Sequence, residues 1–299
     1  MARTSTTAAT APRTPPKFLA LIPPNAGIDF VRLAPTMIGV SLAAVLTSVV
    51  LLLTWGLNYG IDFAGGTMVQ VRFNEPTTAS DVRAALEQGK LKGAVVQDVG
   101  KEHTEFQVRV AQIEEGKAEE ASNDVREALR GRFGEGTYEM LRVETVGPKV
   151  GRDLWRDATL AVLFSTLLMG IYIAIRFDFR FGLGAAVALL HDVLITLGAL
   201  VLTQMDFDLT TVAALLTVVG FSVNDTVIIS DRIRENFRKR RRDPLRLIIN
   251  DSINETLSRT VITSGTAIVV VVTLFLVGGD VIRSFAFSLM VGFVVFLGL

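Results

Sequence analysis

Six apolar stretches, each near the length that crosses a bilayer, constrain this chain more than any other feature. They cover residues 36–56, 158–175, 181–203, 209–230, 259–277 and 281–299. A helix of roughly 20 apolar residues spans the hydrocarbon core, and a helix satisfies its own backbone hydrogen bonds in lipid. Half of the residues are hydrophobic, which is typical of a polytopic membrane protein and not of a soluble domain. We therefore predict an α-helical polytopic membrane protein with six transmembrane helices.

The segment before the first span has a different character. Residues 1–35 are rich in Ala, Thr and Pro, and "TPPKF" and "IPPNAG" interrupt any continuous helix. The first apolar stretch begins too late and is too long for a cleaved signal peptide. We therefore predict a flexible tail at 1–35, a first span at 36–56, and five further spans within 155–299.

Residues 57–154, between the first two spans, alternate between strand and helix patterns. "TMVQVRF", "AVVQDVG", "EFQVRV" and "YEMLRVETVG" read as strands, and residues 78–90 and 114–133 read as helices, with Ser80 as N-cap of the first. The order β-α-β-β-α-β predicts an α+β ferredoxin-like domain. It is expected to lie wholly on one side of the membrane.

Loop charges predict the orientation. The connection 231–257 is strongly basic, and the loop after the second span carries Arg176 and Arg180, whereas "QMDFD" between spans three and four has no Lys or Arg. Because basic loops stay in the cytoplasm, both chain ends are expected inside and residues 57–154 in the periplasm. The basic run is most simply a topology signal and a lipid contact, and we expect no nucleic-acid role.

Three sites place ionisable groups within apolar sequence: His191-Asp192, Asn224-Asp225 and Arg259. A charge at the bilayer centre costs about 2.5 kcal/mol or more, so such groups usually face the bundle interior and mark an ion path or a buried ion pair. The antiparallel order of spans four and five brings Asp225 and Arg259 to similar depths. We predict that they make contact.

Hydroxyl groups could extend a proton path from this pair. Arg259, Thr263 and Thr266 are spaced to share one helix face, and Asp192 and Asn224 are further candidates for the path. The alternatives are that Arg259 only reaches the inner headgroups and that Asp192 is structural. With no cysteine and two histidines, a metal site is improbable, and no cofactor is expected.

Two glycine-containing motifs flank the predicted periplasmic domain. "GIDFAGGT" contributes Gly60, Gly65 and Gly66, and "VGPKVG" contributes Gly147 and Pro148. Their spacing fits neither a Walker A loop nor a dinucleotide fingerprint. We interpret them as bends or hinges that join membrane helices to strands.

Taken together, these motifs resemble the smaller subunits of the SecD/SecF protein-export family, within the RND superfamily. The resemblance rests on "GIDFAGGT", "VGPKVG", "ALLHDVLITLG", "GFSVNDTVIISDRIRE" and "INETLSRTVITSGT", in that order. It implies an RND-type half-transporter of the bacterial inner membrane that pairs with SecD beside the SecYEG channel, with YajC as a further possible neighbour. The family's essential carboxylate, its partner arginine and a nearby threonine match Asp225, Arg259 and Thr263.

The resemblance also implies that protons drive late export of an unfolded preprotein, without enzymatic chemistry. On this hypothesis Asp225 alternates between an ionised and a protonated state, and the periplasmic domain moves in response. Two alternatives stay open: a passive scaffold subunit of the translocon, and a small-molecule RND-type proton antiporter. A domain of this size is small for the second, because such exporters need substrate pockets in large external domains.

Overall fold

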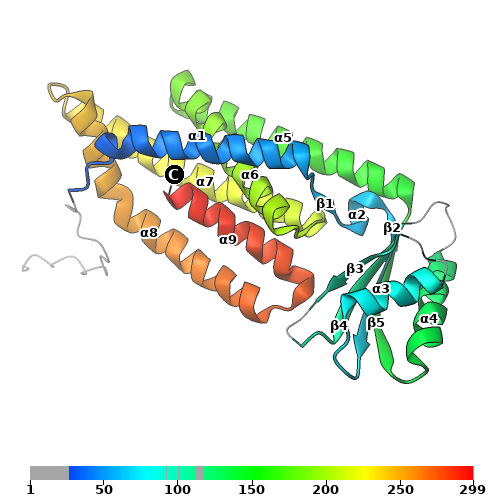
Figure 1. Ribbon diagram of the computed structural model, residues 1–299. Helices are drawn as coiled ribbons and strands as arrows, with labels where there is room; N and C mark the ends of the chain where they lie inside the picture. Colours follow the sequence, from blue (N-terminus) through cyan, green and yellow to red (C-terminus); the bar gives the residue numbers. More distant parts are fainter. Residues whose placement is uncertain (1–26, 90, 92, 100–101, 112–117, 299) are drawn as a thin grey trace, which may run out of the picture.

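The computed structural model describes residues 27–89, 91, 93–99, 102–111 and 118–298. Figure 1 shows a long bundle of helices with a small α/β module (residues 66–146) at one end. The connection between α7 and α8 lies at the opposite end of the bundle, which we call the basic end. Most of the predicted tail 1–35 lies outside the described residues, and α1 begins at Phe30.

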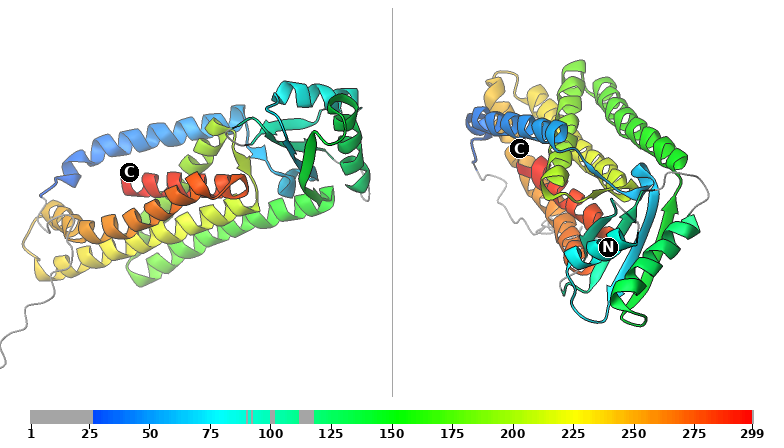
Figure 2. Two further views of the ribbon diagram at one scale, coloured as in Figure 1. Left: turned by 90° about the horizontal axis from the view of Figure 1, so that it is seen from below. Right: turned by 45° about the vertical axis from the view of Figure 1, so that its right-hand side comes forward.

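Five helices are long and apolar enough to cross a membrane. They are α1 (Phe30–Thr54), α5 (Pro148–Arg176), α6 (Phe179–Thr203), α7 (Leu209–Lys239) and α8 (Leu245–Val277). After the 3₁₀ turn η1 (Asp280–Ile282), the sixth apolar stretch forms α9 (Arg283–Gly298), a shorter helix. In the left view of Figure 2, α1, α5, α7, α8 and α9 run along the length of the bundle and α6 crosses it obliquely.

The helices extend beyond the apolar stretches from which the sequence predicts them. The segment 231–257 is not a basic loop, because α7 runs to Lys239 and α8 begins at Leu245. Polar pairs spaced by three or four residues stabilise this continuation of α7. Arg232 contacts Glu235 at 2.6 Å, and Lys239 contacts the same carboxylate at 2.5 Å.

Small residues allow the helices to approach one another closely. A Cβ added at Gly182 of α6 would lie 2.4 Å from the Ala174 Cβ of α5, and one at Gly292 of α9 would lie 2.3 Å from the Val218 side chain of α7. Such positions are common where membrane helices pack. At the basic end, the Asn254 side chain of α8 bonds both the N–H and the C=O of Ile28, which fixes the chain just before α1.

The α/β module contains four strands and two helices in the order predicted from the sequence. They are β2 (Gly66–Phe73), α3 (Ala79–Gln88), β3 (Val95–Asp98), β4 (Glu105–Val110), α4 (Ala118–Phe133) and β5 (Tyr138–Val146). The sheet has the order β3-β4-β2-β5, and each neighbouring pair is antiparallel. Fully buried Val71, Leu86, Phe106 and Leu129 form the core between one sheet face and the two helices.

The N-cap of α3 differs from the prediction. Thr78, and not Ser80, is the N-cap residue: its backbone is extended and its hydroxyl accepts from the Asp81 N–H at 3.1 Å. Ser80 is already the second helical residue, although its hydroxyl lies 2.7 Å from that of Thr78. An N-cap needs a non-helical backbone, which residue type alone does not reveal.

A short irregular junction joins the module to the bundle. The two-residue strand β1 (Asn58–Tyr59) pairs in parallel with β6 (Asp206–Phe207), which lies between α6 and α7. The single turn α2 (Ile61–Ala64) follows β1 and packs against the start of α5. The face of the module's sheet that α3 and α4 leave uncovered meets this junction.

Candidate functional site

A cavity of about 310 Å³, open on one side, lies between α1, α6, α7 and α9. Its polar lining consists of Ser41, His191, Asp192, Ser222, Asp225 and Thr226. The side chains of Asp192 and Asp225 are buried, with residue exposures of 3% and 7%. The cavity therefore brings two of the predicted carboxylates together.

Asp192 is held in place by two hydrogen bonds. The Ser222 hydroxyl of α7 donates to Asp192 Oδ2 at 2.7 Å, and His191 Nδ1 lies 2.9 Å from Asp192 Oδ1. A buried carboxylate needs such donors. The bond from Ser222 also ties α6 to α7 at the level of the cavity.

Asp225 lies one turn further along α7 than Ser222 and is less well satisfied. Its Oδ2 atom is buried without a hydrogen-bond partner, as is the Nε2 atom of the neighbouring His191. A water molecule occupies about 30 Å³ in the liquid, so the cavity has room for waters that complete these bonds. Two acids and an imidazole around a space of this size form a set of groups that can take up and pass on a proton.

Arg259 of α8 does not make the predicted contact with Asp225. The structure shows neither a hydrogen bond nor an ion pair between these two described side chains, and Arg259 is exposed. The guanidinium nevertheless lies near enough to act on the carboxylate through its charge. The relation is a longer-range electrostatic one, and the prediction of direct contact is wrong for this conformation.

The other predicted path residues lie away from the cavity. Asn224 is exposed on a different side of α7 and lines a shallow groove with Phe221. Thr266 is also exposed, and its hydroxyl bonds the Thr263 carbonyl of its own helix at 2.8 Å. Neither Thr263 nor Thr266 lines the cavity.

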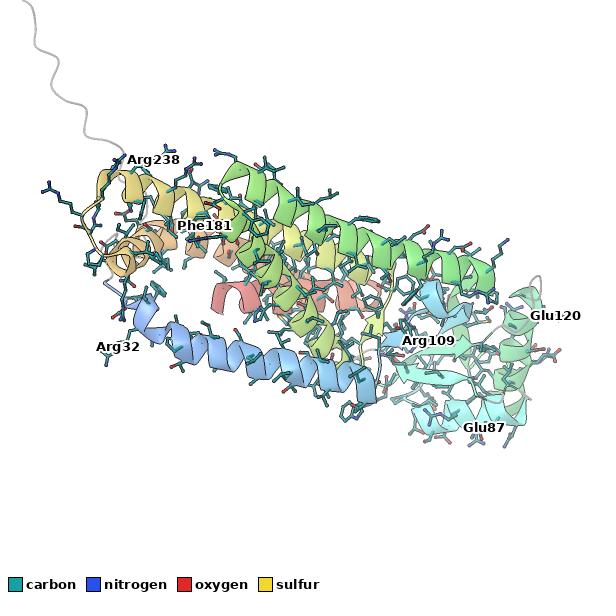
Figure 3. The ribbon with its side chains drawn as sticks, turned by 90° about the horizontal axis from the view of Figure 1, so that it is seen from above. Arg32, Glu87, Arg109, Glu120, Phe181 and Arg238 are labelled. Carbon is teal, nitrogen blue, oxygen red and sulfur yellow. The ribbon has the colours of Figure 1, made fainter. Side chains whose placement is uncertain are left out.

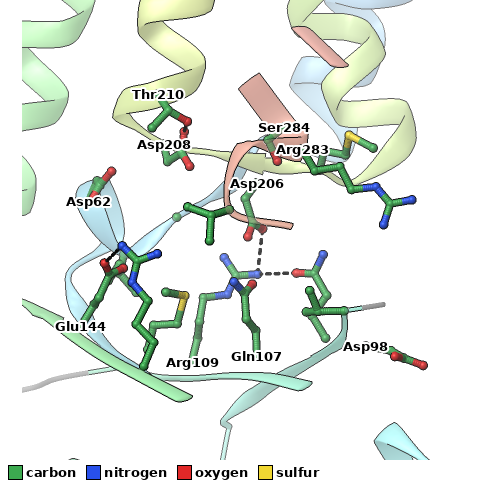
Figure 4. A pocket seen from close by; sticks show the side chains of 18 of the residues that line it. Asp62, Asp98, Gln107, Arg109, Glu144, Asp206, Asp208, Thr210, Arg283 and Ser284 are labelled. Carbon is green, nitrogen blue, oxygen red and sulfur yellow. Dashed lines mark hydrogen bonds and ion pairs between the residues drawn. The ribbon is translucent and has the colours of Figure 1, made fainter. Parts of the chain in front are cut away.

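A second cavity, of about 330 Å³, lies at the junction between the module and the bundle (Figure 4). Arg109 of β4 projects into it, and its Nη2 atom lies 3.2 Å from Asp206 Oδ1 of β6. Sequence reasoning missed both residues, because neither interrupts an apolar stretch.

Burial raises the pKa of the Asp206 carboxyl above its ordinary value. The positive charge of Arg109 opposes this shift, and the negative charge of Asp208 adds to it. The other charged residues around this cavity are Asp62, Asp98, Arg142, Glu144 and Arg283.

The predicted hinge residues lie at the same junction. Gly60 is the N-cap of α2, and its N–H donates to the Phe207 carbonyl at 2.9 Å. Gly65 has a φ of +71° and Gly66 a φ of +124°, both in the region that favours glycine. Gly147 and Pro148 are the N-cap and first residue of α5, where proline is well suited.

Two family models match this chain. The model for the C-terminal part of the protein export membrane proteins SecD and SecF matches residues 125–297, and the SecD/SecF GG motif matches residues 50–77. The first covers more than half of the chain. The chain belongs to the SecD/SecF family.

Known proteins agree with this assignment. The chain is 42% identical over 273 residues to protein translocase subunit SecF of Desulfurispirillum indicum, covering 90% of this chain and 86% of that protein. It is 46% identical over 266 residues to SecF of Magnetococcus marinus, covering 88% and 85%. Together with the five apolar helices, these relatives indicate a multi-pass membrane protein.

The crystal structure of SecDF from Thermus thermophilus, described as a translocon-associated membrane protein, superposes with a TM-score of 0.81 at 36% identity. The match covers 90% of this chain but only 36% of the SecDF chain. Within this family, the GG-motif match contains Gly60, Gly65 and Gly66, and the C-terminal match contains Asp192, Asp225 and Arg259.

Proposed function

We propose that this chain is an auxiliary subunit of the Sec translocon that, with a SecD partner, uses the proton gradient to assist late export of unfolded proteins. Its relatives are named protein translocase subunits. The observation that carries the proton-driven part is the cavity in which Asp192, His191 and Asp225 are gathered. Buried titratable groups with unsatisfied atoms inside a membrane bundle are typical of proton relays.

The proposal includes six spans of the RND type and a ferredoxin-like module outside the membrane. The apolar helix α9 would be the sixth span. The strand order β3-β4-β2-β5 with two helices on one face supports the ferredoxin-like assignment. The module would correspond to the predicted domain 57–154, although α5 already begins at Pro148.

The distribution of basic residues supports an inner-membrane orientation with the module in the periplasm. Arg32 near the start of α1 and Arg238 near the end of α7 lie at the basic end of the bundle, and Arg109 lies at the module end (Figure 3). The basic end also holds Arg240, Arg241, Arg242 and Arg246. By the positive-inside rule this end faces the cytoplasm.

In the proposed cycle, a proton entering from the module side reaches the cavity and neutralises Asp225. Arg259, a positive charge on the neighbouring helix α8, would be the counter-charge of the ionised state. One elementary charge crossing the membrane releases about 2.3 kcal/mol per 100 mV. Since about 1.4 kcal/mol is tenfold in an equilibrium constant, one proton is enough to bias a two-state helix packing by more than tenfold.

The partners follow from the same proposal. SecD would complete the pseudo-symmetric pair, SecYEG and YajC would be neighbours in the translocon, and the preprotein in transit would be the cargo. Thr263 and Thr266, which do not line the cavity here, would take part only if α8 rotates during the cycle. Asn224 faces away from the cavity, which makes a direct proton role for it the weakest of the predicted ones.

The experiment is export by membrane vesicles that contain the complete complex with Asp225→Asn. We expect assembly to persist and the gradient-dependent part of export to be lost. Asp231→Asn is the matched control, because Asp231 lies on the same helix but is exposed. Normal gradient-driven export by Asp225→Asn would leave the passive scaffold as the better account.

A further inference from the structure

One arginine joins the module's sheet to the junction strands β1 and β6. Arg109 of β4 has a side-chain exposure of 10%, and its guanidinium reaches out of the sheet into the junction. Its Nη1 donates to the Tyr59 carbonyl at 3.0 Å, and its Nη2 donates to Asn58 Oδ1 at 3.2 Å. The same Nη2 forms the ion pair with Asp206.

The residues that Arg109 contacts are hydrogen-bonded to the segment that leads into α7. Asn58 Nδ2 donates to Asp206 Oδ1 at 2.8 Å and to the Gln204 carbonyl at 3.0 Å. Two residues after Asp206, Asp208 caps α7 by accepting from the Thr211 N–H at 2.8 Å. A force on Asp206 is therefore applied directly to the first turn of α7.

The orientation of Arg109 within the module is also restrained. Its Nη2 atom lies 3.3 Å from Gln97 Oε1 of the neighbouring strand β3. On the other neighbouring strand, β2, Met68 is buried and lies directly across from Arg109 in the sheet register. The planar guanidinium, with donors in a fixed fork, suits such simultaneous contacts better than a lysine would.

Helix α7 also carries the cavity residues. Ser222 and Asp225 lie on it, and Ser222 is bonded to Asp192 of α6. A displacement of α7 that follows protonation in the cavity would be carried along the rigid helix to its first turn, and from there to Asp206. Arg109 is the group through which the sheet of the module would receive it.

We propose that Arg109 is the positioning residue that couples the α/β module to α7 through Asp206 and Asn58. This inference rests on the proposed function, since it assigns the route by which a proton event in the bundle moves the module. The covalent links through α2 and α5 keep the module attached, and Arg109 sets its angle.

The first test measures that angle directly in the complex with its SecD partner. The chain contains no cysteine, so spin labels at Glu87→Cys on α3 and Leu202→Cys on α6 attach only there on this chain, and the SecD partner is used in a cysteine-free form. We expect a single narrow distance distribution in the parent and a broad one with a second population in Arg109→Gln. An unchanged distribution in Arg109→Gln would overturn the proposal.

The matched control is Arg72→Gln. Arg72 lies in the neighbouring strand β2 and pairs with Glu105 of β4 at 2.7 Å, wholly within the module. We expect the label distances to stay narrow in this variant. Equal broadening in both variants would show a general effect of losing an ion pair, and would contradict the coupling role.

Hydrogen exchange of the β2 amides tests whether unfolding of the module causes the broader label distances in Arg109→Gln. We expect these amides to stay protected in Arg109→Gln, because the core on the opposite face of the sheet is untouched. Loss of their protection would make Arg109 a folding residue and overturn the proposal.

Export assays then separate this inference from the proposed function. We expect Arg109→Gln to lower gradient-driven export as Asp225→Asn does, while a SecD-containing complex still assembles. Normal export by Arg109→Gln together with loss in Asp225→Asn would reject the coupling role alone. Normal export by both would reject the proposed function itself.

Discussion

Gly66, at the first position of β2, offers a sharp test of how the module is attached. Its φ is +124°, a region that residues with a side chain rarely adopt. A Cβ placed there would lie 2.5 Å from the Val110 carbonyl oxygen and 3.5 Å from the Ala111 Cα. Both neighbours are backbone atoms at the end of the paired strand β4, so they cannot rotate away as a side chain would.

The cost of Gly66→Ala follows from these two effects. Holding alanine in a sparsely populated backbone region costs about 1–3 kcal/mol, and forcing extra atoms into a packed site costs about 1–3 kcal/mol. The sum, about 2–6 kcal/mol, is a large part of the 5–15 kcal/mol that stabilises a typical domain. We expect the pairing of β2 with β4 to loosen first.

Hydrogen exchange of the detergent-solubilised full chain measures this. We expect faster exchange of the β2 and β4 amides in Gly66→Ala, with the membrane helices unaffected. Gly147→Ala is the control, because Gly147 has a φ of −66° and no atom lies within 4 Å of its added Cβ. Exchange in Gly66→Ala that matches the Gly147→Ala control would refute the reasoning.

Three further predictions concern the cavity, the core and the junction. Ser222→Ala leaves the buried Asp192 carboxylate with one donor fewer, and we expect a loss of about 1–3 kcal/mol in thermal unfolding; an unchanged midpoint would show that the bond contributes little. Leu129→Ala, at 0% exposure in the module core, should cost about 2–5 kcal/mol in denaturant titration, and a cost below this range would mean that the site collapses around the cavity. Since the pKa of Asp206 is raised, its ion pair with Arg109 is complete above that pKa and weakens as the pH falls through it, before an ordinary aspartate titrates. Label distances that stay narrow as the pH falls through this range would contradict a weakened Arg109–Asp206 ion pair. The free energy of unfolding should not fall when Asp206 takes up this proton, because the folded state binds the proton more readily than the unfolded chain does.

The apolar pattern predicts where membrane helices lie but not where they end. Apolar residues indicate which part of a helix is surrounded by lipid, whereas α7 and α8 continue into polar sequence at the basic end. There the helix is stabilised by side-chain pairs such as Arg232–Glu235. Alternation of polar and apolar residues likewise identified the strands of the module, because each has one face in its core.

The interior charges were predicted to face the bundle, and Asp192 and Asp225 do line its cavity. The sequence could not show that Asn224 lies away from the cavity, because adjacent residues on a helix point about 100° apart and the interior side is set by neighbouring helices. Depth alone suggested that Asp225 and Arg259 touch. In this conformation Asp225 is buried and Arg259 is exposed.

The contacts across the junction were beyond sequence reasoning. The strands β1 and β6 have two residues each and lie far apart in the chain, too short for any periodic signal. Arg109 occupies the polar-facing position of an alternating strand, where a solvated arginine would look the same. Only the fold shows that this face meets Asp206 instead of solvent.

The most direct test of the account follows the module while a proton gradient is applied. The complex with its SecD partner, labelled at Glu87→Cys and Leu202→Cys, is reconstituted in liposomes, and the label distance is measured with and without an imposed pH difference. We expect the distance to shift in the parent and to stay fixed in Asp225→Asn. No shift in the parent, or the same shift in Asp225→Asn, would contradict a mechanism in which this carboxyl group moves the module.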